Sequence, residues 1–209
     1  MVFGTVLDRG DGQFPLYIIG GRLMYSFFSS GTKAAATSIR KNSGMIKKVY
    51  VAKYLYPLSS VMFNFIIFLI SLLTLIPVAI YTRTLPTHYI WQVIPALAIL
   101  IMLTLGVGMI LATLMVFFRD MEYLWNVVLL LIMYMCAIFY YPEKIIQSDY
   151  APILTFNPVY CTIDIFRGGI MGYQAASWQF VYSFVFGVVV MIIGTILFRS
   201  KQDKFILHI

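Results

Sequence analysis

Charged residues are scarce in this sequence. Lys and Arg number 15 and Asp and Glu number 8 among 209 residues, so that 11% of the chain is charged and 61% is hydrophobic. A soluble domain is about a quarter charged, because it needs a polar surface around its apolar core. The shortage of charge excludes a soluble fold. The sequence is predicted to be an all-α integral membrane protein, with one transmembrane domain over residues 1–209.

Residues for nucleotide chemistry or catalysis are also missing. No Gly-x-x-x-x-Gly-Lys-Ser/Thr loop occurs, so the chain cannot hold nucleotide phosphates in a P-loop. The long apolar runs contain no Asp, Glu or Lys, and His88 and His208 lie at their edges. Cys136 and Cys161 lack metal or redox spacing. We therefore expect no cofactor, no metal site and no catalytic residue in this chain.

Long apolar runs are what the sequence has in abundance. A helix needs about 20 mostly apolar residues to cross the hydrocarbon of a bilayer. The predicted spans are residues 14–32, 57–81, 91–117, 125–141 and 179–198. The first of them is interrupted by Gly20, Gly21 and Arg22. Small residues allow close helix packing, and a lone arginine can face the bundle interior or a wet cavity, so we include this span.

The basic residues predict the orientation. A net charge of +7 would suggest nucleic acid as a partner for a soluble chain, but here most Lys and Arg flank apolar spans and act as topology signals. Short loops rich in Lys and Arg remain in the cytoplasm. Such residues are Lys33, Arg40, Lys41, Lys47, Lys48, Lys53, Arg199, Lys201 and Lys204. We expect a multi-pass protein of the cytoplasmic membrane with its C-terminus inside and no nucleic-acid partner.

This orientation places the N-terminus outside. Only a short apolar stretch at residues 1–7, and no signal peptide, precedes the first predicted span. We expect residues 1–7 to be the outer end of a further span, which would make the sequence a shortened version of a longer protein. The alternative is a five-span protein whose short N-terminal tail is translocated.

Residues 40–54 are expected to form an amphipathic cytoplasmic segment. Asn42 and Ser43 are good N-caps, and Lys47 and Lys48 would point away from the apolar face of a helix that begins there. The residues on that apolar face are Met45, Ile46, Val49 and Tyr50. Two interpretations remain open: an interface with a partner protein, or a membrane-surface helix that anchors the topology.

The connections on either side of the fourth predicted span carry further patterns. In the turn between the third and fourth spans, Asp120 or Glu122 suits the dipole of the following helix and Arg119 can pair with either, although a simple cap and loop explains them too. The connection over residues 142–177 is too long and too apolar for a free loop. We expect short re-entrant helices there, broken at Asn157-Pro158, that line an exit.

Six motifs follow one another along the chain. They are Asn42-Ser43-Gly44-Met45-Ile46-Lys47-Lys48-Val49-Tyr50, Tyr56-Pro57-Leu58, Phe118-Arg119-Asp120, Ile138-Phe139-Tyr140 before Pro142, Asn157-Pro158 and Phe166-Arg167. Together they resemble the polysaccharide, O-antigen and teichoic-acid export permeases of the type-2 ABC family. The resemblance runs from about Phe14 to the tail at residues 201–205, and the expected N-terminal helix is missing from it.

The resemblance implies a six-span permease that pairs with a second copy and docks two ATPase subunits, which hold the ATP and Mg. It implies that residues 40–54 carry a coupling helix seated in the ATPase, and that short gate helices precede the last span. It also implies an aromatic channel, since aromatic faces suit sugar rings. The expected lining is Tyr134, Phe139, Tyr140, Tyr141, Asn157, Pro158, Tyr160, Phe166 and Arg167. Anchoring of the tyrosines at the membrane interface is the alternative.

The function expected from the resemblance is ATP-driven export of a lipid-linked polysaccharide or teichoic-acid-type polymer, in contact with membrane lipids. Arg40 and Lys41, or Lys47 and Lys48, could attract the pyrophosphate of the lipid carrier at the inner surface. One alternative is a permease of the same fold that exports drugs or small lipids. A second is an intramembrane glycan-processing enzyme, which would need catalytic residues that the spans lack.

Overall fold

The computed structural model describes residues 13–48, 51–82, 88–118, 120–142 and 151–205. All regular structure within these ranges is helical, which confirms the predicted all-α class. The longer helices are α2 (Phe14–Lys41), α4 (Leu55–Leu72), α6 (Val93–Phe117), α7 (Met121–Met135), α10 (Pro158–Met171) and α11 (Ser177–Lys201). The shorter ones are α3 (Ser43–Ile46), α5 (Leu75–Tyr81), α9 (Ala151–Thr155) and the 3-10 turns η1 (His88–Gln92) and η2 (Gln202–Lys204).

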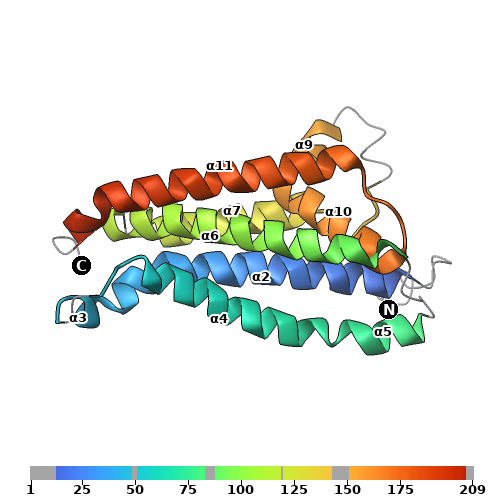
Figure 1. Ribbon diagram of the computed structural model, residues 1–209, viewed down its shortest axis with the longest axis horizontal. Coiled ribbons are helices and arrows are strands. Elements are labelled where there is room, and N and C mark those ends of the chain that lie inside the picture. The colour runs from blue at the N-terminus through green and yellow to red at the C-terminus, as the bar shows by residue number, and fades with distance from the viewer. Residues whose placement is uncertain (1–12, 49–50, 83–87, 119, 143–150, 206–209) are drawn as a thin grey trace.

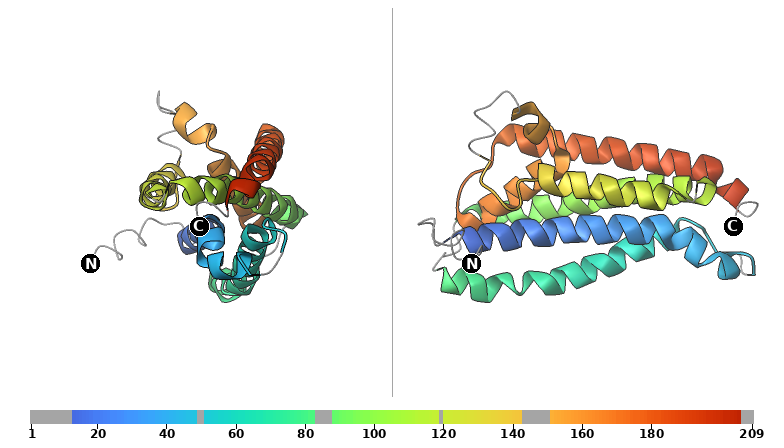
Figure 2. Two further views of the ribbon diagram at one scale, coloured as in Figure 1. Left: turned by 90° about the vertical axis from the view of Figure 1, so that its left-hand side faces the viewer. Right: turned by 180° about the vertical axis from the view of Figure 1, so that it is seen from behind.

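Helix α2 lies in the middle of an elongated bundle (Figure 1), with α4 on one side and α6 on the other. Helix α11 packs along α6, and α7 lies beside α6 when the bundle is seen from behind (Figure 2). Helix α3 and the C-terminal end of α11 lie at one end, which we call the basic end. The start of α2, together with α5 and α10, lies at the opposite end, which we call the α10 end.

Helix α2 has more buried residues than any other described helix and is longer than the predicted span. It has 28 residues and continues past Thr32 to Lys41. Its buried residues include many small ones, which let neighbouring helices approach closely. These small buried residues are Gly20, Gly21, Gly31, Thr32, Ala35, Ala36, Thr37 and Ser38. Of the two places allowed for Arg22, the bundle interior or a wet cavity, the structure excludes the interior: Arg22 is exposed, and its Nη1 lies 3.4 Å from the sulfur of Met133 on α7.

The other predicted spans agree with the helices in part. Within the described ranges, three helical stretches are long and apolar enough to cross a membrane, namely Leu55–Tyr81, His88–Phe117 and Ser177–Lys204. The first contains a break between α4 and α5. The prediction that one helix covers residues 125–141 is wrong, because α7 ends at Met135 and Ala137 adopts a φ of 45°. A residue in the left-handed region stops an α-helix.

Large apolar side chains are exposed along α4, α7 and α11. Phe63 on α4 and Ile196 on α11 are 65% and 63% exposed, and Leu129 is the one buried residue that belongs to α7. A water-soluble protein would not present such continuous apolar surface. Hydrocarbon chains or a second apolar surface must therefore cover these helices.

Helices α6 and α11 cross in close contact at two glycines. A Cβ atom at Gly106 would lie 2.7 Å from the backbone nitrogen of Met191 and 2.8 Å from the carbonyl carbon of Val190. A Cβ atom at Gly194 would lie 2.5 Å from the carbonyl oxygen of Gly106. Backbone atoms cannot rotate away as a side chain can, so this crossing requires residues without a Cβ atom.

We expect Gly106→Ala to force α6 and α11 apart and to destabilise the protein by about 1–3 kcal/mol through overpacking. The midpoint of thermal aggregation in detergent would measure the effect. Gly44→Ala is a matched control, because a Cβ atom there meets nothing within 4 Å. Equal midpoints for the two variants would contradict the close crossing.

Candidate functional sites at the two ends of the bundle

Helix α3 at the basic end is shorter than the predicted amphipathic helix. It covers Ser43–Ile46, and a turn at Lys47–Lys48 follows, while Val49 and Tyr50 lie outside the described residues. Asn42 occupies the N-cap position, but its Nδ2 donates to the carbonyl oxygen of Ser38 at 2.8 Å instead of capping α3. Lys47 and Lys48 are exposed, as expected.

Met45 and Ile46 do not share one apolar face, so that part of the prediction is wrong. Met45 is 55% exposed and Ile46 is 8% exposed. Consecutive residues of a helix lie about 100° apart around its axis, and α3 is too short to build a continuous apolar stripe. Ile46 therefore points into the protein, and Met45 remains available at the surface.

Ile46 belongs to a small apolar cluster, which we call the basic-end cluster. Its buried members are Ile39, Ile46, Tyr56, Ala112, Val116, Phe198 and Phe205. They come from α2, α3, α4, α6 and α11 and from the residue after η2. The Phe205 ring lies 5.2 Å from that of Phe198, edge to face. Ile46 is the one buried residue of α3, so this cluster is where α3 is packed against the rest of the bundle.

Two polar contacts accompany the cluster. The Nζ of Lys53 donates to the carbonyl oxygen of Gln202 at 2.7 Å, which connects the segment before α4 to the end of α11. Arg40 on α2 forms an ion pair with Glu122 on α7, with 3.7 Å between Nη1 and Oε2. Both side chains are partly exposed, so this pair contributes little stability. It nevertheless gives Glu122 a partner other than the expected Arg119, which lies outside the described residues.

The predicted helix break at Asn157-Pro158 is confirmed. Helix α9 ends at Thr155 and α10 begins at Pro158. The Oδ1 of Asn157 accepts from the backbone N–H groups of Val159 and Tyr160 at 3.0 and 3.4 Å, which is an N-cap. Asp120 occupies the corresponding position before α7 but makes no side-chain cap bond.

Arg167 on α10 is 1% exposed and lies against α2 and the turn after α7. Its Nε donates to the carbonyl oxygen of Tyr17 at 3.2 Å, and its Nη1 donates to that of Ala137 at 3.3 Å. Its Cζ lies 3.5 Å from the centroid of the Tyr17 ring, a cation–π contact. Among the described residues, no carboxylate forms an ion pair with it. The two carbonyls and the ring therefore replace part of the water that this cation loses on burial, while its Nη2 has no hydrogen-bond partner within the described residues.

The same contacts hold the turn that ends α7. The phenol oxygen of Tyr17 lies 3.0 Å from the carbonyl oxygen of Ala137 and 3.2 Å from that of Tyr140. Ala137 therefore keeps a left-handed conformation that residues with a Cβ atom disfavour. A Cβ atom at Gly21 would collide with the guanidinium of Arg167. We call Tyr17, Gly21, Ala137 and Arg167 the Arg167 cluster.

A second polar group holds the loop between α10 and α11. Gln92 is fully buried; its Nε2 donates to the carbonyl oxygen of Tyr173, and its Oε1 accepts from the backbone N–H of Ala175, both at 3.2 Å. Asp164 accepts from the Tyr173 phenol at 2.8 Å and from Nε2 of Gln179 at 3.0 Å. Burial and the nearby Asp164 carboxylate raise the pKa of Tyr173, so its phenol remains a donor at neutral pH.

The residues predicted to line the exit fall into two groups. Tyr134 and Phe139 are 58% and 47% exposed, whereas Tyr160, Phe166 and Arg167 are buried between helices of the same chain. Tyr140, Tyr141, Asn157 and Pro158 are intermediate. The structure thus brings Arg167, Tyr140 and Tyr141 together around Tyr17. The role of the whole set in lining an exit stays a prediction.

The sequence analysis missed Tyr17, Gly21, Gln92 and Asp164 as members of these polar groups. A signal was present in the glycine doublet inside the first span and in an arginine inside an apolar connection. A Cβ atom at Gly20 would lie 3.6 Å from the Phe166 ring. The doublet therefore faces Phe166-Arg167, although no local pattern predicts which helices meet.

The helices, the apolar surface and the basic end together define a multi-pass membrane protein. Residues 1–171 match the family described as ABC-2 type transporter, and the chain belongs to this family. Members of the family are transport components, not enzymes, and the family implies a separate ABC ATPase as partner.

Several curated proteins are similar to almost the whole chain. The O-antigen export system permease protein RfbA of Klebsiella pneumoniae is 27% identical over 98% of this chain and 79% of its own length. The polysialic acid transport protein KpsM of Escherichia coli is 25% identical over 97% of this chain and 80% of its own length. RfbA of Myxococcus xanthus is 22% identical over 98% of this chain and 80% of its own length.

Replacement of Arg167 should loosen the turn after α7. In a Cys161→Ser background, we expect Arg167→Met to raise the rate of thiol labelling at the buried Cys136 at least about tenfold, because one or two buried hydrogen bonds that keep the turn closed are lost. Arg22→Met is the matched control, since Arg22 is exposed. A labelling rate unchanged by Arg167→Met would refute the role of the cluster in holding this turn.

Replacement of Phe205 should open the basic end alone. Phe205→Ala removes a fully buried ring, which costs about 3–5 kcal/mol in a packed core. We expect faster hydrogen exchange over residues 39–46 and 195–203 and unchanged exchange in α10. Phe156→Ala, at a phenylalanine that is 64% exposed, serves as the control. Uniformly faster exchange in both ends would show that the cluster is not a separate unit.

Proposed function

We propose that this chain is the membrane-spanning subunit of an ATP-driven exporter that moves a lipid-linked polysaccharide across the cytoplasmic membrane. The observation that carries the proposal is the similarity of 97–98% of the chain to permeases of O-antigen export and polysialic acid transport. The relatives' names supply O-antigen and polysialic acid as classes of cargo, and a teichoic-acid-type polymer is a further candidate that stays a prediction. The bundle supplies helices long and apolar enough to span the bilayer.

The basic end faces the cytoplasm in this proposal. It carries Lys41, Lys47, Lys48 and the C-terminal Lys201 and Lys204, and Lys-rich connections remain inside. The α10 end then faces outward, with α9 and α10 as re-entrant helices beside the exit. Helix α2, the α4–α5 pair, α6, α7 and α11 are the five spans, and the C-terminus lies inside.

Helix α3 is the proposed contact with the ATPase. Met45 and the lysines at positions 47 and 48 are exposed at its tip, whereas Ile46 is anchored in the basic-end cluster. An exposed apolar side chain ringed by cations suits a cleft with an apolar floor and an acidic rim. Val49 and Tyr50 belong to the same segment by sequence. Two ATPase subunits would hold the ATP and Mg and act on two copies of this chain.

Force would pass from the ATPase to the spans through the basic-end cluster. Ile46 belongs to a cluster whose other buried members come from four long helices and from Phe205, and packed apolar groups transmit displacement because they do not compress. The tie between Lys53 and Gln202 adds a direct link from the coupling segment to α11. Closure of the ATPase pair would thus tilt α2, α4, α6 and α11 together and open a passage between the two permease copies.

Transport in a reconstituted system tests the proposed cargo. The intact protein and its cognate ATPase, placed together in vesicles, should move a polyprenyl-pyrophosphate-linked glycan across the bilayer only with ATP and Mg. An ATPase variant without its P-loop lysine is the negative control. Export of a hydrophobic dye in place of the glycan would favour the drug or small-lipid alternative and overturn the polysaccharide assignment.

The contact through α3 has its own test. We expect Met45→Glu to weaken ATPase capture at least about tenfold, as loss of an apolar anchor at an interface does, without a change in thermal stability, because Met45 is exposed. Co-purification of the tagged ATPase measures it. Gln174→Glu adds the same charge at the exposed loop of the α10 end and should have no effect. Full capture by Met45→Glu would show that the ATPase docks elsewhere.

A further inference from the structure

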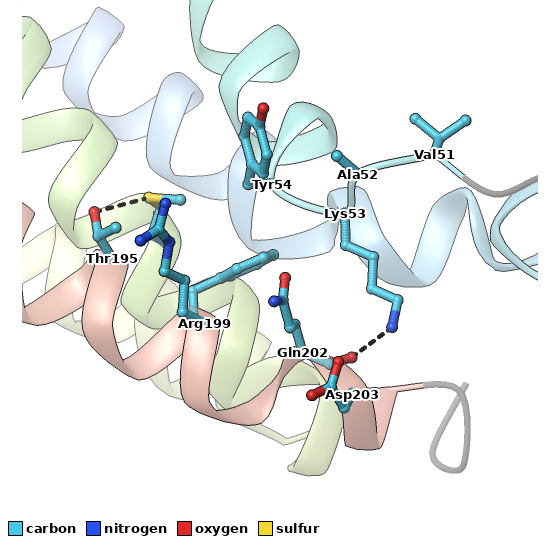
Figure 3. A pocket seen from close by; sticks show the side chains of 10 residues that line it. Val51, Ala52, Lys53, Tyr54, Thr195, Arg199, Gln202 and Asp203 are labelled. Atoms are coloured by element: carbon cyan, nitrogen blue, oxygen red, sulfur yellow. Dashed lines mark hydrogen bonds between the residues drawn. The ribbon is translucent and has the colours of Figure 1, made fainter.

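A cavity of about 490 Å³ opens at the basic end between the segment before α4 and the ends of α6 and α11. Its size falls within the range of small-molecule sites in proteins. Figure 3 shows Arg199 on one side of the pocket and Lys53 on the other, with Gln202 between them. Met109 and the exposed Tyr54 form part of an apolar wall.

The two cations of this pocket retain unused hydrogen-bond donors. Lys53 gives one of its three N–H groups to the carbonyl oxygen of Gln202. Within the described ranges, Arg199 forms no ion pair, and neither does Lys53, because the ion pair found there joins Arg40 to Glu122. Asp203 also lines the pocket but pairs with neither. The pocket therefore offers two incompletely used cations next to an apolar wall.

The position of the pocket along the helices indicates which part of the bilayer it faces. Arg199 lies in the last turn of α11, and Lys53 lies just before α4. The helical stretches that follow or contain these residues, Leu55–Tyr81 and Ser177–Lys204, are long and apolar enough to cross a bilayer. Their basic ends therefore lie at the level of the lipid headgroups.

We propose that this pocket binds the phosphate group of an anionic membrane lipid, with Lys53 and Arg199 contacting the phosphate and the wall of Tyr54 and Met109 contacting the first part of the acyl chain. The sequence analysis assigned lipid phosphate to Arg40 and Lys41 or to Lys47 and Lys48. That assignment stays a prediction; Lys53 and Arg199 form a further site, because they line one cavity. The binding does not depend on which polymer the protein exports.

Retention of a defined lipid tests the pocket. The intact protein, purified in mixed micelles of phosphatidylcholine and phosphatidic acid, is examined by native mass spectrometry for bound phosphatidic acid. Each cation near an anionic headgroup contributes about fivefold in affinity, so Lys53→Gln with Arg199→Gln should weaken retention about 25-fold. Lys47→Gln with Lys48→Gln removes the same charge from the same end, outside the pocket, and should leave retention within about twofold.

A variant that keeps both charges tests the pocket independently, in case the double mutant misfolds. Ala52 lines the pocket and is exposed, so Ala52→Phe should fill the space and also lower retention of phosphatidic acid. Unchanged retention in Ala52→Phe, or an equal loss in the control pair, would overturn the proposal and leave ordinary membrane-surface lysines as the explanation.

A competition separates a lipid headgroup from a soluble phosphate. Inorganic phosphate added at the concentration of phosphatidic acid should not displace the lipid, because it gains nothing from the apolar wall. Displacement would assign the pocket to a soluble phosphate and overturn the lipid assignment. Lipid retention is measured without transport, so a negative result here leaves the export proposal standing, and failure of export leaves this test valid.

Discussion

The burial of α2 from several sides is the constraint on which the bundle depends. Helices α4, α6, α7 and α10 all contact α2, and they can approach it closely because half of its buried positions are Gly, Ala, Ser or Thr. In hydrocarbon, apolar surface alone gives helices no reason to associate, so close packing and a few polar contacts must hold them. The helix that looks least like a membrane span by hydropathy is thus the one that organises the others.

Different kinds of interaction stabilise the two ends of the bundle. At the basic end, interlocking aromatic and aliphatic side chains join α2, α3, α4, α6 and α11, and the contact is non-directional, so it can transmit a push without breaking. At the α10 end, directed contacts from Arg167, Tyr17 and Gln92 hold two turns in defined conformations. Directed bonds switch between made and broken, which suits a part of a transporter that opens and closes.

The cations illustrate how one residue type serves separate purposes along the same chain. Arg40 is paired with a carboxylate, Lys53 ties two segments together and Arg167 is buried over an aromatic ring. Lys47 and Lys48 remain exposed beside α3. A count of positive charge explains orientation in the membrane, but the partner of each cation explains what it does.

The sequence by itself determined the membrane class, the helical content and the break at Asn157-Pro158, because hydropathy, charge and capping act within a few residues. It also contained the ordered motifs that resemble the export permeases. Two predictions from the sequence were wrong: that one helix covers residues 125–141, and that Met45 shares one apolar face with Ile46. The partners of Arg40 and Arg167 were not predicted. Such contacts join residues far apart in the chain: Arg167 and Tyr17 are 150 residues apart, and so, at 149, are Lys53 and Gln202. Only tertiary packing brings such groups together, since local pattern carries no information on which helices will meet.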